Sequence, residues 1–159
     1  MTESLTTDEY HFFWNGPFSQ HDIVFLKVNY EEYNCAEQYM MATKAKIFKD
    51  YGVLQEIMAV TDPRDHKKLG RQIKNFDSAI WDEHKEDVVY DGNLAKFTQN
   101  PAHHKALINT GSRLLVEASP YDGIWGIKMA INDPEIRNPK AWKGENLLGE
   151  ILTALRDSL

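Results

Sequence analysis

Cysteine is almost absent from this sequence of 159 residues, in which Cys35 is the single example. An internal disulfide is therefore excluded, and one thiol with scattered histidines gives no closed set of zinc ligands. A lone cysteine fits a reducing compartment, so we expect a cytoplasmic protein. No hydrophobic run approaches the length of a membrane span, and the N-terminus lacks the basic-then-apolar pattern of a secretory signal.

Excess positive charge is also missing, because 24 acidic residues outnumber 18 basic ones and give a formal net charge of -6. This balance argues against broad electrostatic binding of a nucleic-acid backbone, but it permits a small basic pocket for one phosphate or one modified nucleotide. Hydrophobic residues make up 42%, which is ordinary for a globular protein. We expect one domain over residues 1–159, with residues 1–9 flexible.

Two runs near the N-terminus have the composition of strands. Tyr10–Trp14 is rich in aromatic residues and ends at the turn signal Asn15-Gly16-Pro17, whereas Ile23–Tyr30 is rich in branched and aromatic residues. We expect these runs to form a small antiparallel sheet, with Ser19, Gln20 and His21 in the loop between them.

Helical patterns dominate the rest of the chain. Thr61-Asp62-Pro63 is a helix-start signal, and Asp77 or Ser78 caps another helix. A strand is expected at Leu114–Ala118 and a long loop at Ser119–Lys143. The expected helices cover residues 33–48, 53–58, 64–73, about 78–97, 102–109 and a last segment that begins near 144–146.

The stretch Tyr33–Phe48 carries the clearest sign of a site. Glu37 falls in the uncharged first half of this expected helix, so we expect its carboxylate to be partly desolvated. Lys44 lies two turns further on, on roughly the same side. An acid near a base in an apolar setting can perform acid–base chemistry or hold a polar ligand. The alternative is that Glu37 is favoured by the helix dipole and points to water.

Three further segments could bind a ligand. Arg71 follows a basic helix, and its guanidinium suits phosphate, although a solvated basic face explains it equally well. Trp125, with Asp122 before it, lies between two glycines in a loop and offers a stacking surface, unless it closes the core. Trp81 has the same two interpretations. The glycines of 144–149 either expose helix amides to phosphate or allow a tight turn.

Several short motifs follow one another along the chain between about Phe12 and Arg156. They are Phe18-Ser19-Gln20, Ala36-Glu37-Gln38-Tyr39 with Ala42 and Lys44, Gly70-Arg71, Trp81, Leu94-Ala95-Lys96-Phe97 with Gln99, Leu115-Val116-Glu117, Asp122 with Trp125-Gly126, Gly144, Asn146-Leu147-Leu148-Gly149 and Leu155-Arg156. The order and approximate spacing of these motifs resemble those of the NADAR family, which includes the YbiA-like proteins. The sequence departs from the family at Gln20, where Asn is expected, and at Gln38, where His is frequent.

The resemblance implies a helix-dominated α+β single domain with a small antiparallel sheet, which hydrolyses N-glycosidic bonds. Family members are associated with two substrates: ADP-ribose on a guanine base of nucleic acid or a nucleoside, and phosphorylated ribosyl pyrimidines of riboflavin synthesis. Both contain a ribose C1–N bond and phosphate. Neither a metal nor another cofactor is required, and no membrane or stable protein partner is indicated.

The resemblance also suggests roles for individual residues. Glu37 would stabilise the ribosyl cation and activate water, and Asp122 would be the second carboxylate. Substrate binding would involve Ser19, Lys44, Arg71, Trp81, Trp125, Gly126 and Asn146. A competing hypothesis is a non-catalytic module that binds ADP-ribose or a related nucleotide without needing Glu37, and an acidic scaffold protein is a third.

Overall fold

The computed structural model describes residues 3–159. Contacts divide the chain into two compact units, Gln20–Asn100 and the combination of Met1–Ser19 with Pro101–Leu159. The assignment of the chain to a single domain remains a prediction. No helix within residues 3–159 has the length and apolar composition needed to cross a membrane.

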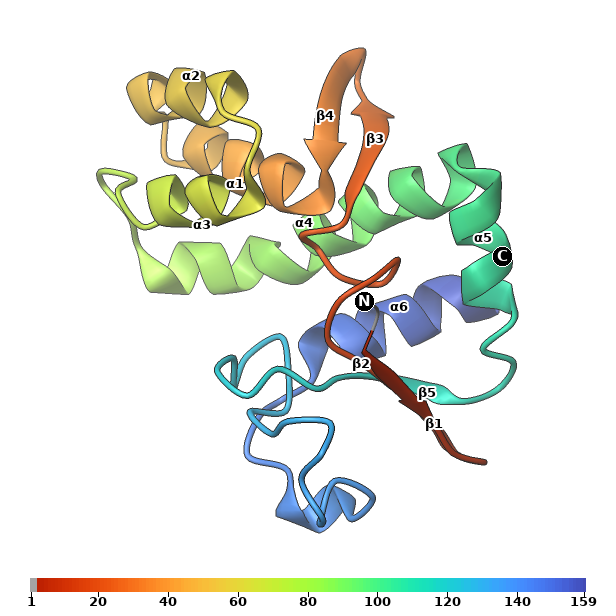
Figure 1. The fold of residues 1–159 in the computed structure, drawn as a ribbon. Helices are drawn as coiled ribbons and strands as arrows, with labels where there is room; N and C mark the ends of the chain where they lie inside the picture. The colour runs from red at the N-terminus through yellow and green to blue at the C-terminus, as the bar shows by residue number, and fades with distance from the viewer. Residues whose placement is uncertain (1–2) are drawn as a thin grey trace. The chain divides into compact units, whose positions relative to one another are not determined.

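The Gln20–Asn100 unit begins with an antiparallel hairpin of β3 (Ile23–Val28) and β4 (Glu31–Cys35) (Figure 1). Asn29 and Tyr30 connect the strands with positive φ angles of 52° and 69°, the backbone that a tight hairpin turn requires. The expected pairing of Tyr10–Trp14 with Ile23–Tyr30 is therefore wrong, because the second run pairs with the segment that follows it. Four helices complete this unit: α1 (Ala36–Ile47), α2 (Tyr51–Ala59), α3 (Pro63–Gly70) and α4 (Ser78–Gln99).

Helix α1 begins at Ala36, three residues later than the sequence pattern predicts, because Tyr33–Cys35 belongs to β4. Cys35 caps the helix: its Sγ accepts the N–H of Gln38 at 3.4 Å. The side chain of Gln38 accepts the N–H of Asn34 at 2.8 Å and donates to the carbonyl of Ile57 at 3.1 Å. These contacts join β4, α1 and α2 around the start of α1.

Helices α3 and α4 each approach α1 closely at a glycine. A Cβ atom on Gly70 at the end of α3 would overlap the Met41 side chain, and one on Gly92 of α4 would overlap the Tyr39 ring. Asp62 and Asp77 cap α3 and α4 as their positions in the sequence predict. Helix α1 consequently packs against α3 and α4.

The other unit contains a three-stranded sheet in the order β1-β2-β5. β1 (Ser4–Thr6) runs antiparallel to β2 (Tyr10–Phe13), and β5 (Leu114–Glu117) runs parallel to β2. Of the stretch 1–9 that was expected to be flexible, Ser4–Thr6 forms β1, whereas residues 1–2 lie outside the described residues. Helix α5 (Pro101–Ile108), a short 3-10 helix at Pro139–Ala141 and α6 (Leu147–Ser158) complete the unit.

Helix α6 packs on β5 with the apolar face that its sequence predicts: Leu148, Leu152 and Leu155 are fully buried. A second cluster around Phe12, Val116 and Ile127 anchors the long loop before α6. The predicted helix-dominated α+β fold is confirmed. Antiparallel pairing joins β3 to β4 and β1 to β2, and the three-stranded sheet also contains the parallel pair of β2 and β5.

Candidate active site

Glu37 occupies the first turn of α1 and is almost completely buried, with 4% of its surface exposed. Its backbone N–H donates to the carbonyl of Gln20 at 2.9 Å. Its Oε1 lies 3.4 Å from Nε2 of His21, whose side chain is 39% exposed. An imidazole at this distance can donate a proton to the carboxylate while remaining open to solvent. His21 was assigned no role from the sequence, where only its place in the loop after Gln20 marked it.

The loop that carries His21 is fixed by buried hydrogen bonds. Oε1 of Gln20 accepts Nδ2–H of Asn93 at 2.8 Å, and the same Asn93 amide donates to the carbonyl of Val89 at 2.8 Å. Both Gln20 and Asn93 are buried. Because Gln20 also accepts the N–H of Glu37, one residue ties α4 to the start of α1. The carboxylate and its imidazole neighbour are thereby held on rigid backbone.

Lys44 connects Glu37 with the other residues predicted for this region. Its Nζ donates to the carbonyl of Gly70 at 3.1 Å and lies 4.6 Å from the Phe76 ring centre and 5.6 Å from that of Trp81. Burial lowers the pKa of the Lys44 ammonium; the charge of Glu37 opposes that shift, and Arg71 adds to it. The Gln20–Asn100 unit thus brings Glu37, Lys44, Arg71 and Trp81 into one neighbourhood.

Arg71 and Trp81 occupy opposite settings within this neighbourhood. Arg71 is the exposed C-terminal cap of α3, so its guanidinium can reach an incoming phosphate. Trp81 is 9% exposed and offers its face to Lys44, which favours a cation–π support over a broad stacking platform.

A buried polar cluster lies near the start of α1. Burial raises the pKa of the Cys35 thiol to about 11, and its Sγ lies 3.6 Å from Nδ1 of His66. Nε2 of His66 lies 2.8 Å from the carbonyl of Val60, which can only accept a hydrogen bond. Nε2 therefore donates to this carbonyl, and Nδ1 faces the thiol. This arrangement makes Cys35 a structural residue rather than a nucleophile.

Lys96 of α4 is fully buried, which is rare for lysine. Burial lowers the pKa of its ammonium to about 8, against smaller opposing effects of Asp22 and Cys35. Asp22 follows His21 directly, so the ammonium of Lys96 interacts electrostatically with the loop that contacts Glu37. The resemblance included Lys96 among its motif residues, but no role was assigned to it.

The buried ammonium of Lys96 predicts a pH dependence of stability. Between about pH 8 and pH 10.5 the unfolded chain keeps this proton and the folded chain loses it, so the free energy of unfolding should rise with pH. Lys96→Met should remove this contribution, and the exposed Lys67→Met should not. Urea denaturation of the three proteins across this pH range measures the difference. Parallel curves for the wild type and Lys96→Met would contradict the assignment.

Asp122 and Trp125 lie in the other unit, on the loop between β5 and α6. Oδ1 of Asp122 accepts the backbone N–H groups of Ile124 and Trp125, each at 2.9 Å. The carboxylate thus shapes the turn that carries the half-buried indole of Trp125. Its second oxygen remains able to orient a ligand, since a carboxylate offers several acceptor positions.

Asn146, Gly126 and Ser19, the other residues predicted to bind substrate, lie in the same unit as Asp122 and Trp125. Oδ1 of Asn146 accepts the N–H of Glu117 at 2.9 Å, and its Nδ2 donates to the carbonyl of Leu115 at 3.1 Å. These bonds favour a structural role that joins β5 to the start of α6. Gly126 is buried where a Cβ atom would lie 2.9 Å from the carbonyl oxygen of Glu117. Ser19 is buried, and its N–H donates to the carbonyl of Gly16 at 3.0 Å.

Within residues 3–159, no group of three or more His, Cys, Asp or Glu side chains is arranged to hold a metal ion. The candidate residues are distributed over the two compact units. Glu37, Lys44, Arg71 and Trp81, joined by His21, lie in one unit; Ser19, Asp122, Trp125, Gly126 and Asn146 lie in the other.

Comparisons with known proteins agree with this architecture. The NADAR domain model matches residues 5–159, so the chain belongs to the NADAR family. N-glycosidase R617 of Acanthamoeba polyphaga mimivirus is 41% identical over 170 residues, which cover 96% of this chain and 98% of that protein. The NMR structure of the Escherichia coli protein YbiA matches with a TM-score of 0.78 and 27% identity, covering 97% of this chain and 86% of that chain.

A plant protein matches a smaller part of the sequence. The chloroplastic riboflavin biosynthesis protein PYRR of Zea mays is 31% identical over 111 residues, which cover 67% of this chain but 16% of that protein. The similarity concerns one segment of a much longer plant protein.

Proposed function

We propose that this chain is an N-glycosidase that releases ADP-ribose from ADP-ribosylated guanine in nucleic acid or a nucleoside. The general activity, hydrolysis of an N-glycosyl bond, follows from the NADAR family and from relatives named N-glycosidases over nearly the whole chain. The chain is thus a hydrolase rather than a non-catalytic nucleotide-binding module. The observation that carries the proposal is a buried carboxylate, Glu37, with an imidazole at 3.4 Å and cationic Lys44 and Arg71 nearby.

These residues suit the hydrolysis of a ribose C1–N bond. As that bond breaks, positive charge develops on the ribose, and the buried carboxylate of Glu37 stabilises it at low dielectric. The oxygen of water bonds to C1 as the C1–N bond breaks, one water proton passes to Glu37, and the departing nitrogen takes up a proton from solvent. His21 can return the proton from Glu37 to solvent. Lys44 and Arg71 would bind the pyrophosphate of the substrate.

The roles proposed for residues of the other unit rest on the resemblance to the NADAR family. Asp122 would orient the ribose hydroxyls through the oxygen that the turn does not use, and Trp125 would stack on the base. Ser19, Gly126 and Asn146 are proposed as supports of the substrate region. The acidic net charge of -6 favours recognition of one extruded or terminal nucleotide over wide contact with a duplex.

A second candidate substrate has an observation of its own. A riboflavin biosynthesis protein is 31% identical to this chain over an alignment that covers 67% of it. A phosphorylated ribosyl pyrimidine is therefore the alternative substrate. That substrate contains the same C1–N bond and one phosphate, so Glu37 and Lys44 would act in the same way.

Direct comparison of the two substrates tests the proposal. The protein is incubated with ADP-ribosylated guanosine and, separately, with a phosphorylated ribosylaminopyrimidine, and the released sugar phosphates are quantified by liquid chromatography. We expect kcat/KM to be at least about tenfold higher for ADP-ribosylated guanosine, because a second phosphate group adds charge-assisted hydrogen bonds. The opposite preference would establish the pyrimidine substrate. Cleavage of neither would refute both assignments.

A further inference from the structure

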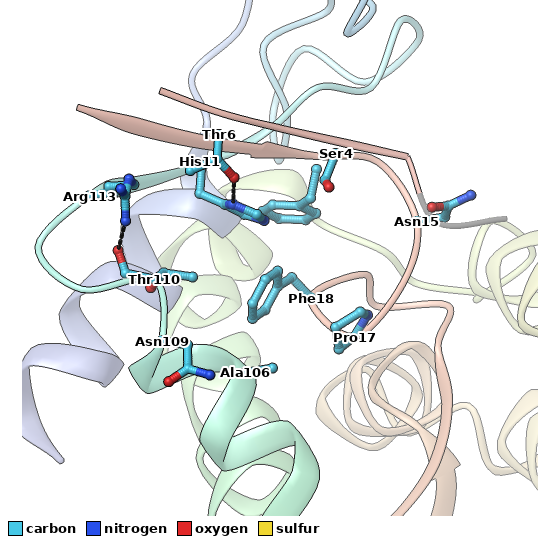
Figure 2. A pocket seen from close by; sticks show the side chains of 11 residues that line it. Ser4, Thr6, His11, Asn15, Pro17, Phe18, Ala106, Asn109, Thr110 and Arg113 are labelled. Atoms are coloured by element: carbon cyan, nitrogen blue, oxygen red, sulfur yellow. Dashed lines mark hydrogen bonds between the residues drawn. The ribbon is translucent and has the colours of Figure 1, made fainter. Parts of the chain in front are cut away.

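A pocket of about 300 Å³ lies in the unit formed by Met1–Ser19 and Pro101–Leu159, and none of its residues belongs to the candidate active site (Figure 2). Side chains of β1 and β2 face α5 across the hollow, with Arg113 at one end and Asn15 at the other. The volume is at the lower end of the range for ligand pockets, so it suits one small molecule. The lining comprises Ser4, Thr6, His11, Phe13, Asn15, Pro17, Phe18, Ala106, Asn109, Thr110 and Arg113.

The charge of this pocket is opposite in sign to that of the chain. The lining contains one guanidinium and no carboxylate, although the sequence has a net charge of -6. Burial lowers the pKa of His11, and the charge of Arg113 lowers it further, so the imidazole is neutral at pH 7. The pocket therefore carries one positive charge, which favours a monoanion.

Two hydrogen bonds to backbone carbonyls hold the Arg113 guanidinium and use only part of its N–H donors. Its Nε donates to the carbonyl of Thr7 at 2.6 Å and its Nη1 to that of Thr110 at 3.3 Å. A guanidinium has five N–H donors, so these two bonds fix its plane and leave three for a ligand. A planar fork of this kind matches the two oxygens of a carboxylate.

The opposite side of the pocket is apolar and aromatic. The Phe18 ring stands edge-on to the Phe13 ring at 5.6 Å between centres and to the His11 ring at 5.4 Å. Pro17 and Ala106 extend this surface. Such a wall accepts a flat apolar body but offers few hydrogen bonds to a hydrated dianion, which makes phosphate a poor occupant.

We propose that this pocket binds a small aromatic carboxylate, with the carboxylate on Arg113 and the ring against Phe18, Pro17 and Ala106. The proposal is independent of the N-glycosidase reaction. It assigns a ligand to a pocket whose lining contains none of the residues proposed for that reaction.

Benzoate is the probe, and its neutral isostere benzamide is the matched comparison. Amide chemical shifts are followed by NMR while each compound is added to the intact protein. We expect saturable shifts at Thr110 and Arg113 with a benzoate dissociation constant on the order of 1 mM, given the few atoms of the ligand. Benzamide and inorganic phosphate should each bind at least about tenfold more weakly. Equal binding of benzamide, or tighter binding of phosphate, would overturn the proposal.

Two variants separate recognition from folding. Arg113→Gln should weaken benzoate binding at least about tenfold, but it also loses the hydrogen bond to Thr7. Ala106→Leu leaves Arg113 intact and fills the pocket from α5, so it should abolish the benzoate shifts. Ala102→Leu, on the same helix but outside the pocket lining, is the control and should bind benzoate as the wild type does. Unchanged benzoate affinity in a folded Ala106→Leu protein would place the ligand elsewhere.

Discussion

Glu37→Gln should lower kcat/KM for the cleaved substrate by about 10²–10⁴-fold while the protein stays folded, as expected when a general acid–base group is removed. The amide is nearly isosteric with the carboxylate but can neither accept the proton of water nor stabilise a ribosyl cation by charge. Because Glu37 is buried beside Lys44, no solvent ion can replace the lost charge easily. Initial rates of base release with the wild type and the variant give the ratio.

The control for this experiment is Glu56→Gln, which makes the same change of net charge at an exposed position of α2. It should leave kcat/KM unchanged, since exposed charges contribute little to local energetics. Thermal unfolding of both variants shows whether the fold survives. A folded Glu37→Gln protein with wild-type turnover would remove Glu37 from the reaction and with it the mechanism proposed here.

Local signals in the sequence predicted most helices correctly because their caps are local. The Asp62 side chain accepts one backbone N–H group of the first turn of α3, and that of Asp77 accepts two in α4. Both helices begin where these residues indicate. The start of α1 was misplaced because its cap is a cysteine, which is not among the usual capping residues. Its Sγ nonetheless accepts the N–H of Gln38.

Strand pairing could not be predicted in the same way, because it depends on residues far apart in the sequence. Tyr10 and Leu114 are partners in a parallel ladder, separated by about a hundred residues, and no short-range pattern specifies that register. Ile23–Val28 instead pairs with its immediate successor through Asn29 and Tyr30, a turn without glycine.

The candidate site was predictable where one helix carries it and not where contacts between elements create it. Glu37 and Lys44 share α1, so their spacing identified them. His21 contacts Glu37 on a loop that two hydrogen bonds of Gln20 hold, one from the N–H of Glu37 and one from Asn93 on α4, and these tertiary contacts have no signature in the sequence. The burial of Lys96 was not predicted, because a lysine in an amphipathic helix is ordinarily exposed.

Replacement of Asn146 tests whether this residue stabilises the fold or contacts substrate. It has the second large expected effect, which is on the free energy of unfolding. Asn146→Ala removes both hydrogen bonds to β5 and leaves the N–H of Glu117 and the carbonyl of Leu115 without these partners. The free energy of unfolding should fall by about 3 kcal/mol, since each buried polar group left unsatisfied costs about 1–3 kcal/mol. Urea denaturation measures the change.

Two further variants define the cause of that loss. Asn146 has a φ of 54°, so Asn146→Gly removes the same hydrogen bonds without the left-handed strain and should be about 1 kcal/mol more stable than Asn146→Ala. Asn132→Ala, at an exposed turn before the same helix, should change stability by less than about 0.5 kcal/mol. If Asn146 instead acts mainly on substrate, Asn146→Gly would keep wild-type stability and raise KM, because the bonds to β5 would then contribute nothing that the folded chain needs.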